Sequence, residues 1–230
     1  MKESLTQSLI DRFRFLKVFA LKSKIFMLFR PFGRIAFKLH YLSLFTSWTA
    51  KHPAKHYGSE RKNMFKELEV DEMDYLEFGV GRGDSFTWWV KHNQNPNTRF
   101  YGFDTFTGMP EKWGGFEEGA FAGDIPELDD RCKFFKGLFQ DTLHGALNEL
   151  DLNRQTVVHI DSDLYSAAIF VLITLSPRLK PGDIILFDEF ATVIDEFRAW
   201  LDFQSIFKYE FRMLGEVDHY RQIAIQLIKT

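Results

Sequence analysis

The chain has 230 residues, of which 45% are hydrophobic and 27% are charged, and its net charge is −3. This composition excludes a disordered chain, and the length predicts one large domain, or one domain with an appendage. The single cysteine, Cys132, excludes an intramolecular disulfide and a thiolate-cluster metal site, so a bound metal would need mostly oxygen ligands.

The first part of the chain is strongly basic. Residues 1–62 contain 13 Lys and Arg against 3 Asp and Glu, whereas residues 63–230 contain 16 against 29. The segment IDRFRFLKVFALKSKIFMLF has the pattern of a basic amphipathic helix that ends before Pro31 and Gly33, and residues 34–48 can form a second helix. The sequence therefore predicts a basic amphipathic helical extension over residues 1–56 and a main domain over residues 57–230.

Three roles for this extension stay open. Its helices suit packing on the main domain or on a second subunit, which would give a homo-oligomer. Their mixture of cations and phenylalanines also suits an anionic membrane surface. Nucleic-acid contact is the weakest of the three, because the isoelectric point of the chain is near 6.2.

The sequence also gives an expectation for the compartment. Cations recur every few residues from Lys2 onward, so no apolar signal-peptide region is recognisable. No run of about 18 uncharged apolar residues occurs, which argues against a membrane-spanning helix. We expect a cytoplasmic protein, with peripheral contact to the inner membrane surface as the alternative.

Residues 59–230 alternate between predicted strands and helices. Strands are predicted at 74–79, 99–104, 132–136, 156–161, 183–188, 208–214 and 221–228. Helices are predicted at 59–68 (capped by Ser59), 86–92, 141–150 and 194–207, and a further helix follows the strand at 156–161 and ends near residue 175. This alternation is typical of an α/β fold with a mostly parallel sheet of seven strands, and the final hairpin adds one antiparallel strand. Residues 105–130 form a long loop rich in Gly, of a length that often carries function.

The first predicted strand ends in a glycine-rich turn, YLEFGVGRG, in which Glu77, Gly79, Gly81 and Gly83 are spaced two apart. Glycines allow a tight turn and let backbone amides approach a ligand. The spacing differs from the Gly-x-Gly-x-x-Gly dinucleotide motif, and the acid at its head suits an ammonium group better than a pyrophosphate. S-adenosylmethionine therefore fits this turn better than a nicotinamide cofactor.

Asp104 ends the second predicted strand, 21 residues after Gly83. A carboxylate at this place in a dinucleotide fold accepts hydrogen bonds from ribose hydroxyls. A purely structural turn would explain the glycines by themselves, but it would not explain Glu77 and Asp104 at these positions. The combination indicates a site for both the adenosine and the amino-acid end of S-adenosylmethionine.

Acidic residues follow the fourth and fifth predicted strands: Asp161 and Asp163 in HIDSDLYS, and Asp188 and Glu189 in IILFDEF. The carboxyl ends of parallel strands meet at one edge, so we expect these acids near the glycine turn. Converging carboxylates attract a hard cation such as Mg²⁺, which can lower the pKa of a substrate hydroxyl. Asp163 is expected instead to cap the following helix, and His159 to pack in the core or beside the site.

Five segments together resemble the macrocin O-methyltransferase family, whose members methylate sugar hydroxyls. They are YLEFGVGRGDSF, FYGFDTFTGMPEKW, KGLFQDTL, HIDSDLYSA and LKPGDIILFDEF, and in this order the match covers roughly residues 57–190. The resemblance implies a Rossmann-like methyltransferase fold, S-adenosylmethionine as methyl donor and magnesium as cofactor.

The resemblance also implies roles for single residues at the acceptor end. Asp161 is similar to the family's metal ligand and proposed general base, and Asp188 and Glu189 match the remaining metal ligands. The family usually has two aspartates at these last two positions, so Glu189 is a departure. A glutamate is one methylene longer and can still reach an ion.

At the donor end, Glu77, Gly79 and Asp104 match the family's donor-binding positions. Asp141, in the QDTL segment, falls where the adenine end of the donor would lie. The implied donor site thus draws on the ends of the first three predicted strands.

The leading hypothesis is an S-adenosylmethionine-dependent, Mg²⁺-assisted O-methyltransferase that acts on a hydroxyl of a sugar or of a glycosylated natural product. Phe106, Trp113 and Phe116 of the long loop are expected to form a lid over a sugar face. Two alternatives remain. A catechol or another phenol would also offer oxygens to the metal, and a non-catalytic module with this fold could dock through its basic helices.

Overall fold

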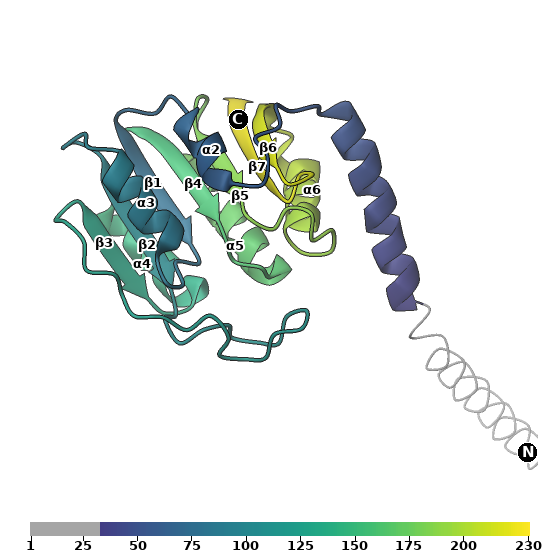
Figure 1. Cartoon of the computed structure of the whole chain (residues 1–230), viewed down its shortest axis with the longest axis horizontal. Coiled ribbons are helices and arrows are strands. Elements are labelled where there is room, and N and C mark those ends of the chain that lie inside the picture. Colours follow the sequence, from purple (N-terminus) through teal and green to yellow (C-terminus); the bar gives the residue numbers. More distant parts are fainter. Residues whose placement is uncertain (1–32) are drawn as a thin grey trace, which may run out of the picture. The chain divides into compact units, whose positions relative to one another are not determined.

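The computed structural model describes residues 33–230 of the chain (Figure 1). Residues 33–51 form a helix, which confirms the helix predicted over 34–48, whereas the helix predicted within residues 10–29 lies outside the described residues. The chain divides after Leu44 into two compact units. None of the described helices is long and apolar enough to cross a membrane.

The second unit, Phe45–Thr230, includes the last residues of that helix. Phe45 packs on Phe197 with 5.1 Å between ring centroids, and Trp48 packs on Phe190 at the same distance. These aromatic contacts bury Trp48 against the domain that follows it in the sequence.

Seven strands form one sheet, and each of them was predicted from the sequence. They are β1 (Met73–Phe78), β2 (Arg99–Asp104), β3 (Cys132–Lys136), β4 (Gln155–Ile160), β5 (Ile184–Phe187), β6 (Glu210–Val217) and β7 (Gln222–Lys229). Their order is β3-β2-β1-β4-β5-β7-β6, and β7 runs antiparallel to both of its neighbours (Figure 1). The pairs β3–β2, β2–β1, β1–β4 and β4–β5 are parallel. The predicted Rossmann-like α/β class, with one antiparallel strand, is confirmed.

Helices cover both faces of the sheet. They are α2 (Arg61–Lys66), α3 (Asp84–His92), α4 (Phe139–Glu149), α5 (Tyr165–Leu175) and α6 (Glu196–Phe207). Tyr75 of β1 packs on Trp89 of α3, whereas Phe78, three residues on and therefore on the other face, packs on Phe139 of α4. The helices α4, α5 and α6 contact one another in turn.

One predicted cap is wrong. Ser59 was expected to cap the helix after it, but α2 begins at Arg61, so Glu60 takes the cap position and makes no side-chain cap hydrogen bond. Packing holds this short helix in place, because Met64 and Phe65 are almost fully buried. This packing fixes the place of Arg61 at the first position of the helix.

The strand ends that matter for function lie in register. The backbone N–H of Asp161 donates to the carbonyl of Phe78 at 2.9 Å, and that of Asp188 donates to the carbonyl of Ile160 at 3.0 Å. Backbone hydrogen bonds therefore hold the carboxyl ends of β1, β4 and β5 side by side. Since they follow the carboxyl ends of the strands, they form the edge where α/β folds bind ligands.

Candidate active site

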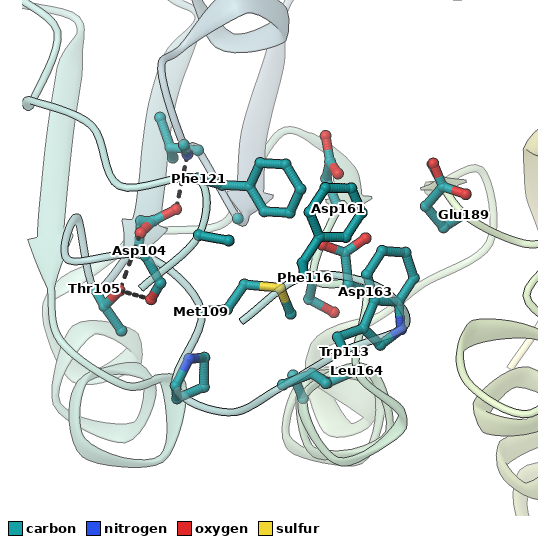
Figure 2. Close-up of a pocket in the computed structure, with 18 of the residues that line it drawn as sticks. Asp104, Thr105, Met109, Trp113, Phe116, Phe121, Asp161, Asp163, Leu164 and Glu189 are labelled. Carbon is teal, nitrogen blue, oxygen red and sulfur yellow. Dashed lines mark hydrogen bonds between the residues drawn. The ribbon is translucent and has the colours of Figure 1, made fainter. Parts of the chain in front are cut away.

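A cavity of about 1010 Å³ opens at this edge of the sheet. Its walls come from the segments after β1, β2, β3, β4 and β5, together with the long loop after β2 (Figure 2). Among the donor-site and metal-site residues proposed from the sequence, those that line it are Gly79, Gly81, Asp104, Asp161 and Glu189. The structure thus brings most of the predicted site residues around one space.

The glycine turn closes tightly against the end of β4. Gly79 has a φ of +101°, and a Cβ at this position would lie 1.8 Å from the backbone oxygen of Asp161. Gly81 also has a positive φ, +54°, but a Cβ there would meet nothing closer than 3.9 Å. Gly83, at φ +79°, is the N-cap of α3 and faces Pro126 rather than the cavity. Gly79 and Gly81 are the two glycines of the turn that line the cavity.

Asp104 is oriented by backbone amides. Its Oδ2 accepts a hydrogen bond from the N–H of Gly81 at 2.8 Å (Figure 2), and its Oδ1 accepts one from the N–H of Phe106 at 2.6 Å. The carboxylate joins the glycine turn to the start of the long loop and still faces the cavity. This position is suited to two adjacent hydroxyls of a ribose.

Besides Gly83, two predicted donor residues lie outside the cavity wall. The carboxylate of Glu77 is fully buried, where it accepts hydrogen bonds from Tyr75 and from Ser85 Oγ, the latter at 2.6 Å. Asp141 is exposed in the first turn of α4, and its neighbour Gln140 lines the cavity instead. Any effect of Glu77 on a ligand would therefore pass through the groups that it holds.

Asp161 and Asp188 meet at one cation, and that cation is a side chain of the protein. Arg61 Nη1 lies 3.2 Å from Asp161 Oδ2 and also donates to Asp188 Oδ1. Gln222 Nε2 donates to the same oxygen of Asp188 at 2.8 Å. His159 is buried beside them, with its Nε2 3.7 Å from Asp188 Oδ1.

The environment separates the two carboxyls in acidity. Burial raises the pKa of Asp161 well above its usual value, and the charge of Asp188 adds to this effect. At Asp188 burial acts in the same direction, but the contact with His159 and the charge of Arg61 outweigh it and lower the pKa to about 2. Burial is likewise overcome at His159, where Asp188 and Glu77 raise the pKa to about 9. Asp161 is therefore the stronger base of the pair.

A metal-ligating group exists among the described residues. One nitrogen of His159 and one carboxylate oxygen each of Asp161 and Asp188 lie within 4.8 Å of one another. Two carboxylates are a suitable start for a hard cation. Glu189, the third predicted ligand, is not in this group: its Oε1 accepts from Arg221 Nε at 3.2 Å.

Asp163 does not cap the helix after β4, so this prediction is wrong. The N-cap of α5 is Leu164, which has no side-chain cap hydrogen bond, and Asp163 has a φ of +61° that turns it toward the cavity (Figure 2). Burial raises its pKa to about 7, and the charges of Glu189, Asp188 and Asp195 add to this effect. Asp163 is thus a second carboxyl of raised pKa on the cavity wall.

The long loop gives the cavity an aromatic wall. Trp113 and Phe116 lie nearly parallel, with 6.0 Å between ring centroids, and Phe116 contacts Phe121 at 4.7 Å (Figure 2). All three line the cavity. Phe106, which was expected beside them, is buried against Phe134 instead. Phe121 takes its place because the loop folds back over the glycine turn.

Sequence reasoning missed the groups that pair with the carboxylates. Arg61 is 100 residues from Asp161 and 127 from Asp188, and Gln222 is 34 residues beyond Asp188. No spacing pattern in the chain marks these residues, since they reach the site from α2 and from the start of β7. Only the packing of those elements on the sheet could reveal them.

Comparison with known proteins agrees with this geometry. A model of the family described as "Methyltransferase domain" matches residues 76–190, which is half of the chain. The chain belongs to this methyltransferase-domain family. The matched region contains the glycine turn, Asp104 and both strand-end acidic segments.

Relatives of this methyltransferase domain include two named O-methyltransferases. The 8-demethyl-8-(2,3-dimethoxy-alpha-L-rhamnosyl)-tetracenomycin-C 4'-O-methyltransferase of Streptomyces olivaceus is 30% identical over 142 residues, 51% of this chain and 53% of that protein. The mycinamicin III 3''-O-methyltransferase of Micromonospora griseorubida is 38% identical over 63 residues, 27% of this chain and 23% of that protein. The match thus spans about half of the first relative and less of the second. The resemblance to sugar O-methyltransferases stated from the sequence is confirmed.

A solved structure confirms the fold. The crystal structure of CalS11, a calicheamicin methyltransferase, superposes with a TM-score of 0.59 at 22% identity, over 72% of this chain and 76% of that chain. At this identity the likeness establishes a methyltransferase fold, which agrees with the sheet order described above.

Proposed function

We propose that this protein is an S-adenosylmethionine-dependent O-methyltransferase that acts on a hydroxyl of a sugar or of a glycosylated natural product. One observation carries the proposal: Asp104 and Asp161 lie on the wall of one cavity of about 1010 Å³, and the glycine turn runs between them. A ribose-binding carboxylate and a basic carboxylate in one space suit a donor at one end and an acceptor at the other. The names of the two relatives support the sugar acceptor.

At the donor end, Asp104 would accept hydrogen bonds from the ribose hydroxyls, and the backbone at Gly79 and Gly81 would approach the amino-acid end. Glu77 would act indirectly, because it accepts a hydrogen bond from Ser85, and Ser85 lines the cavity. We assign the adenine end to the start of α4, where Gln140 rather than Asp141 faces the cavity.

At the acceptor end, Asp161 is the proposed general base. Its raised pKa makes the carboxylate a better proton acceptor, and its neighbour Asp188 stays ionised. The acceptor hydroxyl loses its proton to Asp161 as its oxygen forms a bond to the methyl carbon and the methyl–sulfur bond breaks. Holding the two reactants in line supplies roughly 7–11 kcal/mol in favourable cases, so positioning is the larger part of the task.

The aromatic loop is suited to that positioning. Trp113 and Phe116 present nearly parallel rings to the cavity, and the C–H face of a sugar packs well on such rings. Trp113 is itself held by a hydrogen bond from its Nε1 to Asp195 Oδ2 at 3.3 Å. A sugar seated here would exclude water from the base.

Magnesium assistance is part of the proposal. Asp161 and Asp188 supply oxygen atoms within reach of one ion, and Glu189 would complete the set if it left Arg221. A bound Mg²⁺ would lower the pKa of the acceptor hydroxyl and orient it.

Residues 1–56 stand apart from this reaction in our proposal. Among the described residues, those that line the cavity begin at Arg61. The methyltransferase domain would therefore be residues 57–230, and the basic extension would serve attachment to a second subunit or to an anionic membrane surface.

The decisive experiment measures methyl transfer from labelled S-adenosylmethionine to rhamnosides and, in parallel, to catechol. Transfer to the glycoside supports the proposal, and transfer to catechol alone would replace the sugar by a phenol. Calorimetry with S-adenosylhomocysteine covers the remaining alternative, because no binding at millimolar ligand would indicate a non-catalytic module.

A further inference from the structure

Arg61 occupies the place between the two carboxylates that a metal ion would need. Its Nη1 contacts Asp161 Oδ2 at 3.2 Å and also donates to Asp188. The side chain of Arg61 is 22% exposed, and those of Asp161 and Asp188 are 23% and 9% exposed. Ion pairs this well shielded from solvent are stronger than surface pairs, and breaking one leaves a poorly solvated charge.

The helix that carries Arg61 is firmly placed. Met64 and Phe65 of α2 are 1% and 3% exposed. Phe65 packs edge-on against His159, with 5.6 Å between ring centroids, and His159 belongs to the same metal-ligating group. The backbone of α2 therefore fixes the root of the Arg61 side chain beside the carboxylates.

A second, smaller hollow is also lined by Arg61. It has a volume of about 250 Å³, and Arg61 lines both this hollow and the large cavity. Its lining includes the acidic residues Glu60, Asp188 and Asp218 and one further cation, Arg221, which lies 3.7 Å from Asp218. The guanidinium thus has a place to go if it leaves the carboxylates.

A divalent cation and a guanidinium compete for the same pair of carboxylates, because the two positive charges repel each other at such short range. We propose that Arg61 is a built-in counterion that competes with a divalent cation for Asp161 and Asp188, so that metal binding requires Arg61 to leave. This inference rests on the proposed function only in taking these two aspartates as metal ligands. It makes Arg61 a positioning residue that sets metal affinity.

The test measures Mn²⁺ binding to the full chain in the absence of donor and acceptor. Binding is monitored through the electron paramagnetic resonance signal of free Mn²⁺. Mn²⁺ prefers the same hard oxygen ligands as Mg²⁺. Arg61→Gln is expected to bind Mn²⁺ at least about tenfold tighter than the natural protein, since roughly 1.4 kcal/mol of competition corresponds to that factor. Equal affinity of the two proteins would overturn the proposal.

A matched control separates competition from a general charge effect. Arg82 lines the same cavity but makes no contact with Asp161 or Asp188. Arg82→Gln removes the same charge and is expected to change Mn²⁺ affinity less than about twofold. An increase as large as that of Arg61→Gln would show that long-range charge, not competition, sets the affinity.

A second variant covers the case in which Arg61→Gln fails to fold. Arg61→Lys keeps the positive charge but loses the planar guanidinium, so it should hold the pair less well and bind Mn²⁺ more tightly than the natural protein. Unchanged affinity in this variant, or no Mn²⁺ binding by any of the proteins, would overturn the inference. Because the test contains no donor or acceptor, failure of methyl transfer would leave its outcome unaffected.

Discussion

The cavity has two ends that are built in different ways. At the donor end, Asp104 is held by the backbone amides of Gly81 and Phe106, which lie 23 and 2 residues from it, at the two ends of one β-α-β segment. At the carboxylate end, Asp161 and Asp188 are held by Arg61 and Gln222, which are distant in the sequence. One end is made from turns, and the other from side chains that meet only in the folded protein.

The two ends of the cavity therefore depend on different properties, backbone shape at the donor end and charge at the carboxylate end. The donor end depends on where the backbone can go, because Gly79 allows a contact that any Cβ would block. The carboxylate end depends on electrostatic balance, since burial and neighbouring charges move the pKa values of Asp161 and Asp188 in opposite directions. Substitutions at the first end should therefore alter folding and donor affinity, and those at the second should alter turnover and response to pH.

The largest effect is expected for Asp161→Asn. Turnover should fall about 100- to 10,000-fold, the range for loss of a general base, while the affinity for S-adenosylhomocysteine stays within about twofold. Steady-state kinetics and calorimetry measure the two quantities. If donor affinity fell as much as turnover, the two ends of the cavity would not act separately, and this comparison would be contradicted. Asp130→Asn, a change of the same kind at an exposed residue, is the control.

Next in size is Gly79→Ala, which tests the donor end by shape. A Cβ would lie 1.8 Å from the carbonyl oxygen of Asp161, so the free energy of unfolding should fall by more than about 3 kcal/mol. Gly81→Ala is the matched control: it keeps the strain of a positive φ but has open space, and should cost about 1–2 kcal/mol. Urea unfolding gives both values, and equal losses would contradict the role of close approach.

A smaller effect is expected for Asp104→Ala. Loss of the carboxylate that we propose binds the ribose should weaken S-adenosylhomocysteine binding about 10- to 100-fold, which corresponds to roughly 1.4–2.8 kcal/mol. Asp141→Ala should leave the affinity almost unchanged, because Asp141 is exposed outside the cavity wall. Calorimetry on the two variants sharpens the boundary of the donor end, and the reverse order would relocate the adenosine.

The smallest effect concerns Asp163 and pH. Its pKa rises from 3.8 to about 7 in the folded protein, mainly through burial, so the folded state holds a proton that the unfolded chain loses near pH 4. The stabilisation from this proton is complete below pH 4 and is lost as the pH rises through 7. Asp163→Asn should therefore gain stability relative to the natural protein between pH 5 and pH 8, by roughly 1 kcal/mol. Thermal unfolding at the two pH values measures this gain. If the difference in stability between the variant and the natural protein were the same at both pH values, the pKa of Asp163 would not be raised by folding.

Much of the fold could be predicted because its signals are local. Apolar runs of four to eight residues bounded by turns identified all seven strands, and the last hairpin identified the antiparallel one. The place of the glycine turn and of Asp104 on one cavity could also be predicted, since both belong to one β-α-β segment. The caps assigned to Ser59 and Asp163 failed because the residues at the cap positions of α2 and α5 are Glu60 and Leu164, and neither makes a side-chain cap hydrogen bond.

The sequence by itself determined the fold class, the meeting of the glycine turn and Asp104 at one cavity, and the convergence of acids at the carboxyl ends of β4 and β5. Only the tertiary structure decided what those acids contact: Arg61 between Asp161 and Asp188, and Arg221 on Glu189. The physical reason is the distance along the chain over which each feature is decided. Backbone geometry is set by neighbours in the chain, whereas the pairing of buried charges depends on which elements pack together, and no local pattern records that choice.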